Sequence, residues 1–83
     1  MEKERLKGLN LNQLAVGLRA LRLSHGMSIS DLAEESGSAL AYLSRVETGV
    51  VVPKISTLSD ILAVYNVTIK EFYVWCDSNA HLL

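Results

Sequence analysis

Three glycines, Gly26, Gly37 and Gly49, separate stretches of the chain whose apolar residues recur at helical spacing. The stretch before the first glycine places leucines on one helical stripe, at Leu11, Leu14, Leu18 and Leu21. Short stretches at residues 28–36 and 38–48 precede the other two glycines. A glycine just past such a segment is a common helix stop. This arrangement therefore predicts a helix, a turn, a short helix, a second turn and another helix.

Capping residues support these boundaries and predict two further helices. Ser28 is a good N-cap, and Asp31 follows three residues later, where an acid favours the positive end of a helix. Ser56 is expected to cap a fourth helix, whose buried face is formed by Leu58, Ile61, Leu62 and Tyr65. Thr68 and Glu71 have the spacing of a capping box at the start of a fifth helix.

The chain contains no strand pattern, so the predicted fold class is all-α. One domain is expected over residues 1–83, with its core at residues 11–76 and flexible ends. With 49% hydrophobic and 20% charged residues, the composition is that of a globular protein and excludes a disordered one. Because a chain of 83 residues buries only a modest core, pairing with a second copy is a plausible support.

The net charge of −1 is unevenly distributed. Residues 1–28 carry five basic and two acidic side chains, whereas residues 29–83 carry three basic and seven acidic ones. Attraction to nucleic-acid phosphates is therefore expected to be local. We interpret Lys3, Arg5 and Lys7 as part of a solvated tail in preference to a DNA-binding arm.

Side chains that serve enzymes and metal sites are sparse. His25 and His81 have no candidate co-ligands nearby, so we expect no metal, and no residue arrangement indicates catalysis or a cofactor. The single cysteine, Cys76, excludes an internal disulfide and fits a reducing compartment. No apolar run is long enough to span a bilayer and no signal segment opens the chain, so the expected location is the cytoplasm.

Two motifs link these helices to a known family. SxxxLAxxxG begins at Ser28, and YLSRVExG begins at Tyr42. Over residues 14–72 the chain resembles the Cro/CI-type (XRE) family of helix-turn-helix regulators. The matching positions are Leu18, Leu21, Arg22, Gly26, Met27, Ser28, Leu32, Ala33, Gly37, Leu43, Glu47, Gly49, Pro53, Leu58 and Val67.

The resemblance implies a five-helix, lambda-repressor-like domain that binds double-stranded DNA. It implies that the third helix enters the major groove and that a homodimer binds a two-fold symmetric operator. It also implies that Arg22 pairs with Glu47 and braces the first helix against the end of the third. A guanidinium fork suits a carboxylate, which agrees with this pairing.

The expected DNA contacts follow from the resemblance. Ser28 and Thr57 would hold phosphates, Lys54 would contact another phosphate, and Tyr42, Ser44 and Arg45 would reach bases or nearby backbone. The complete predicted set is Ser28, Ile29, Ala39, Leu40, Ala41, Tyr42, Ser44, Arg45, Lys54 and Thr57. Large apolar side chains on the last helix are good dimer anchors, and the predicted dimer contacts are Ile69, Phe72, Tyr73, Trp75 and Cys76.

The expected DNA face departs from the family pattern in being apolar. Ile29 stands where glutamine is common, Ala39 to Ala41 stand where polar residues are common, and Val50 to Val52 replace a loop that is often basic. Three alternatives follow. The face still binds DNA, with Ala and Leu packed on thymine methyl groups. Or Ile29, Leu40 and the valines form an exposed patch for a protein partner, in an anti-repressor or assembly module. Or the valines are buried in the core and no patch exists. We expect the first.

Overall fold

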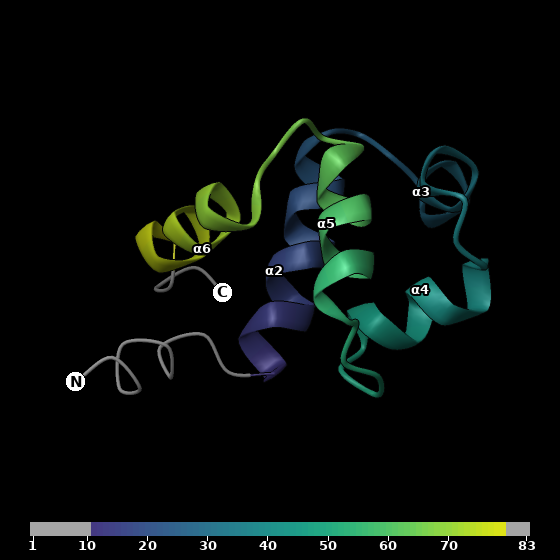
Figure 1. Cartoon of the computed structure of the whole chain (residues 1–83), viewed down its shortest axis with the longest axis horizontal. Coiled ribbons are helices and arrows are strands. Elements are labelled where there is room, and N and C mark those ends of the chain that lie inside the picture. Colours follow the sequence, from purple (N-terminus) through teal and green to yellow (C-terminus); the bar gives the residue numbers. More distant parts are fainter. Residues whose placement is uncertain (1–10, 80–83) are drawn as a thin grey trace.

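The computed structural model describes residues 11–79, and these form five helices without a strand (Figure 1). They are α2 (Leu11–Ser24), α3 (Ile29–Ser36), α4 (Leu40–Glu47), α5 (Ile55–Ala63) and α6 (Ile69–Ser78). The predicted all-α class is confirmed. The predictions for Lys3, Arg5, Lys7 and His81 concern residues outside the described part of the chain.

Local capping explains where α3 and α6 begin and where α3 ends. In α3 the Ser28 hydroxyl accepts from the Asp31 amide, and the Asp31 carboxylate accepts from the Ser28 amide, both over 3.0 Å. Thr68 and Glu71 form the same reciprocal pair at the start of α6. Gly37 ends α3 with a φ of 76°, a left-handed conformation that favours glycine. Both predicted capping arrangements are confirmed.

The start of α5 corrects one prediction. Lys54, and not Ser56, is the N-cap, and its carbonyl accepts from the Leu58 amide over 2.8 Å. The helix begins directly after the Pro53–Lys54 extended segment, so Ser56 already lies inside the first turn and cannot cap it. As a result, no side chain caps α5.

The core joins all five helices around the predicted leucine stripe. Its central members are Leu18, Leu21, Leu32, Leu43, Val46, Leu58, Ile61, Leu62, Tyr65, Phe72 and Cys76. The helix α4 packs on α2 and α3, whereas α6 packs on α2 and α5. Figure 1 shows α6 at one end of the molecule and α3 and α4 at the other, with α2 and α5 between them. The two ends therefore offer separate surfaces.

A close approach between α2 and α6 places two predicted dimer residues in the core. A Cβ on Gly17 would lie 2.7 Å from the Cys76 Sγ and 3.2 Å from the Phe72 ring, so only glycine fits this crossing without a shift. Phe72 is fully buried and Cys76 nearly so. This burial corrects the prediction for these two residues, because neither presents a surface to a second copy. Burial also raises the pKa of the Cys76 thiol to about 11, as expected for an unreactive core cysteine.

Candidate nucleic-acid interface

A buried ion pair fixes the position of α4. Arg22 Nε donates to both carboxylate oxygens of Glu47, over 2.9 and 3.2 Å, and its Nη2 donates to Glu47 Oε1 over 2.9 Å. The two side chains are only 10% and 6% exposed. Arg22 Nη1 also donates to the Met27 carbonyl over 2.8 Å. The predicted pair is confirmed, and one guanidinium joins the end of α2, the turn before α3 and the last residue of α4.

The charges of this pair favour each other despite burial. The hydrogen bonds that Arg22 donates to Glu47 raise the pKa of Arg22 above its ordinary value, and they outweigh the effect of desolvation, which lowers it. The guanidinium fork of Arg22 reaches both carboxylate oxygens of Glu47, and its third nitrogen donates to the Met27 carbonyl. Most of the polar atoms of the buried pair therefore have a hydrogen-bond partner. The orientation of α4 on the domain is therefore held by a directional contact as well as by apolar packing.

One face of α4 points outward. Leu43, Val46 and Glu47 are buried, whereas Leu40, Ala41, Ser44 and Arg45 are exposed. Residues three or four positions apart share a helix face, so these four exposed residues form a continuous outer surface, apolar in its first turn and polar one turn later. We call it the α4 outer face. Tyr42 is half-buried against the core at its edge.

The helix starts near this face differ in how their amides are satisfied. Neither α4 nor α5 has a side-chain cap at its N-cap residue, Ala39 or Lys54. The first amides of a helix lack intrahelical acceptors and favour anions. At α3, in contrast, the Asp31 carboxylate already accepts from the Ser28 amide, and these hydrogen bonds lower the pKa of Asp31. A phosphate would meet a negative charge at Ser28 and none at the starts of α4 and α5.

Few cations lie near the α4 outer face. The two cations are Arg45 and Lys54, and both are exposed. The neutral Thr57, in the first turn of α5, is half-buried. Glu34 and Glu35 are exposed on the neighbouring α3. Among the described residues, charge alone therefore gives this end of the molecule no strong attraction for DNA.

The apolar loop after α4 is largely outside the core. Val50 and Val52 are 69% and 54% exposed, and only Val51 packs against the core. The alternative in which much of Val50 to Val52 is buried in the core is therefore wrong. Ile55 is also exposed, at 70%. Sequence reasoning did not identify it as a surface residue, because its position three residues before Leu58 is compatible with the buried stripe of α5.

The exposed apolar residues do not form a single patch. Leu40 opens α4 and Val50 follows its end, and an eight-residue helix is about 12 Å long. Ser44 and Arg45 are exposed between them. Ile29, the remaining member of the predicted protein-binding patch, is half-buried against the core. The residues proposed for one protein-binding surface are thus divided by polar ones.

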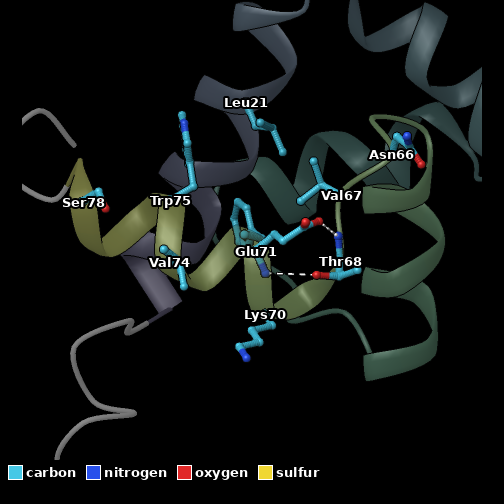
Figure 2. Close-up of a pocket in the computed structure, with 10 residues that line it drawn as sticks. Leu21, Asn66, Val67, Thr68, Lys70, Glu71, Val74, Trp75 and Ser78 are labelled. Atoms are coloured by element: carbon cyan, nitrogen blue, oxygen red, sulfur yellow. Dashed lines mark hydrogen bonds between the residues drawn. The ribbon is translucent and has the colours of Figure 1, made fainter.

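A second surface lies on α6. Tyr73 and Val74 are exposed, and Ile69 and Trp75 are half-buried. An open groove of about 820 Å³ runs along this helix, with Leu21, Val67, Val74 and Trp75 among its lining residues. Figure 2 shows Trp75 beside Leu21 of α2, with Val74 next to Trp75 on α6. The Thr68–Glu71 capping pair lies at the start of α6. Val74 was missed by the sequence prediction.

The described residues contain no group of three or more side chains suited to holding a metal ion. Within the same part of the chain, no helix has the length and apolarity needed to cross a bilayer.

The comparisons with known proteins give one finding. A family model described as helix-turn-helix matches residues 18–72, which run from the middle of α2 into α6. Neither the curated proteins nor the solved structures gave a match.

Proposed function

Since residues 18–72 match its model, the chain belongs to the Cro/CI-type (XRE) helix-turn-helix family of DNA-binding transcription regulators, and from this premise we propose that it binds a two-fold symmetric operator as a homodimer. The observation that carries the proposal is the α4 outer face. It lies on the second helix of the helix-turn-helix, the helix that enters the major groove. The buried Arg22–Glu47 pair gives it a fixed orientation.

In this proposal α4 provides the base contacts. Arg45 can donate two hydrogen bonds to a guanine edge, and Ser44 can contact a base or the adjacent backbone. Tyr42 stands at the edge of the face, where its phenol can reach a phosphate. The uncapped starts of α4 and α5, with Lys54 and Thr57, bind phosphates on either side of the groove. Ser28 contributes less, because Asp31 already occupies the start of α3.

The homodimer would form through α6. Ile69, Tyr73, Val74 and Trp75 provide an apolar and aromatic surface that a two-fold axis would bury twice. Because α6 lies at the opposite end of the molecule from α3 and α4 (Figure 1), a dimer of this kind leaves both α4 outer faces free. Two copies of α4 could then occupy successive turns of the same groove.

DNA binding is tested by mobility shift on fragments of the native locus. We expect a retarded complex with a slope of log K against log salt of roughly −4 to −5 for the dimer, because each neutralised phosphate contributes about 0.9. Arg45→Ala should weaken binding at least tenfold, since each base contact is worth about 1–3 kcal/mol and the dimer makes two of them. Arg19→Ala removes the same charge from an exposed position on α2, outside α4 and α6, and is the matched control. Absence of binding to every fragment at low salt would favour a protein partner.

Dimerisation is tested by sedimentation at micromolar concentration. We expect a dimer for the native chain and a monomer for Val74→Asp, because the carboxylate would be buried unpaired in the interface. Val50→Asp makes the same change at a comparably exposed valine in the loop between α4 and α5, and it should stay dimeric. A native chain that sediments as a monomer would refute the α6 dimer.

A further inference from the structure

The exposed side chains at the first turn of α4 are apolar, and the half-buried Tyr42 stands at their edge. Leu40 is 45% exposed, and Ala39 and Ala41 are exposed beside it. None of them carries a hydroxyl, amide or charge that could pair with a base edge. The first polar side chains on the α4 outer face are Ser44 and Arg45, one turn later. The inference below rests on the proposed function, and in particular on α4 lying in the major groove.

The major groove offers such a surface one type of partner. The apolar group that the base edges display there is the C5 methyl of thymine, while the other groups are hydrogen-bond donors and acceptors. A leucine pressed on a donor or acceptor would displace its water without replacing the hydrogen bond, which is unfavourable. The same contact with a methyl group buries apolar surface on both sides. The first turn therefore selects for a methyl and against the polar edges.

The surroundings of Leu40 favour DNA over a protein as the occupant. The polar residues Ser44 and Arg45 lie between Leu40 and the exposed valines after α4, so the apolar first turn does not continue along α4 into those valines. Arg45 adds a positive charge next to the apolar turn, and α4 begins without a side-chain cap. Both features suit a polyanion, and the domain belongs to a DNA-binding family.

We propose that the first turn of α4 reads pyrimidine C5-methyl groups, with Leu40 and Ala41 packed on one or two thymine methyls in each half-site. Arg45 follows Ala41 by four residues and Leu40 by five, which is about 6–7.5 Å along the helix axis. At about 3.4 Å per base step, a guanine read by Arg45 lies about two base pairs from the methyl-bearing pyrimidine. The methyl of 5-methylcytosine has the same position, so cytosine methylation at this site strengthens binding.

The experiment begins with selection of preferred sites from a random duplex library, followed by affinity measurement on one selected site. Each thymine is replaced in turn by deoxyuridine, which removes the methyl and keeps every hydrogen-bonding group. We expect deoxyuridine at one or two positions of a half-site to lower the affinity of the protein about 4-fold, as burial of one methyl group predicts. The same replacement in both half-sites should lower the affinity about 15-fold. Cytosine at these positions should bind about 4-fold more weakly than 5-methylcytosine.

Two variants assign the effect to residues. At the position read by Leu40, the Leu40→Ala variant should bind thymine-containing and deoxyuridine-containing DNA about equally. Alanine suits a first helical turn, so the fold is preserved. Val50→Ala truncates an exposed valine outside α4 and should retain the full deoxyuridine penalty. Equal binding of thymine and deoxyuridine sites by the native protein would overturn methyl reading while leaving DNA binding intact. A penalty that persists in Leu40→Ala would overturn the role of Leu40. Failure of the selection to enrich any sequence would overturn the proposed function itself.

Discussion

Breaking the Arg22–Glu47 pair should cost the domain a large part of its stability. Glu47→Gln keeps the size of the side chain and one acceptor oxygen, but it turns an –NH₂ group or a neutral oxygen toward a guanidinium that is only 10% exposed. Removing one partner of a buried pair costs about 3–5 kcal/mol. A domain of this length has a total stability of about 4–12 kcal/mol. The variant should therefore melt at least about 12 °C below the native protein.

The double replacement Arg22→Met with Glu47→Leu tests whether the cost comes from the stranded charge. Apolar residues of similar volume leave no buried ion, which is often close to neutral. The double replacement does leave the Met27 carbonyl without its hydrogen-bond donor, which lowers the free energy of unfolding by about 1–3 kcal/mol. We therefore expect the double variant to be more stable than the sum of its single variants by at least about 2 kcal/mol.

Urea unfolding followed by circular dichroism gives these free energies, with the indole fluorescence of Trp75 as a second probe. Glu34→Gln makes the same carboxylate-to-amide change on an exposed residue and should stay within about 0.5 kcal/mol of the native protein. If Glu47→Gln is as mild as this control, or if the two single costs simply add, the pair does not hold α4 in the way we describe.

Three further predictions concern the core and the caps. The Tyr65 hydroxyl is buried without a hydrogen-bond partner, so Tyr65→Phe should stabilise the domain by about 1 kcal/mol in thermal melts. Burial raises the pKa of Tyr65 to about 12. Because the unfolded chain loses this proton near pH 10, the stability of the native protein should fall between pH 10 and 12. The stability of Tyr65→Phe should fall less steeply over the same range. Gly17→Ala should destabilise by about 1–2 kcal/mol, since a clash with Cys76 Sγ outweighs the gain in helix propensity, and Cys76→Ala in the same chain should restore part of this in urea unfolding. Ser28→Ala should cost about 1 kcal/mol by the same measurement, because the capping box of α3 is lost.

The sequence was most informative where several local signals agreed. The start of α3 combined a serine, an acid three residues later and an apolar period, and in the structure Ser28 is the predicted N-cap, with Asp31 completing a capping box. At α5 the only capping signal was Ser56, and the N-cap in the structure is instead Lys54, whose carbonyl accepts from the Leu58 amide. A single serine near a helix start indicates the region but does not fix the N-cap.

Assignments to the surface or the core were harder, because they depend on neighbours that are distant in the chain. Phe72 and Cys76 were assigned to a dimer since a short chain was expected to leave its last helix partly unpacked. Gly17 changes this outcome by allowing α6 to approach α2 closely. A glycine inside a helical stretch was a signal of close approach, but nothing in the sequence indicated which helix would approach.

The same reasoning explains why the α4 outer face could be located but not interpreted from the sequence. The period of Leu43, Val46 and Glu47 fixes the inward side of α4, and the Arg22 contact fixes its direction. Leu40, Ala41 and Arg45 are exposed and contribute little to that arrangement, so substitutions among them should affect recognition far more than folding. Polar residues at Leu40 and Ala41 would leave the core unchanged, so the fold does not require their apolar character, which the methyl-reading proposal explains. Affinity for methylated and unmethylated pyrimidines is therefore the most direct measurement of what this face recognises.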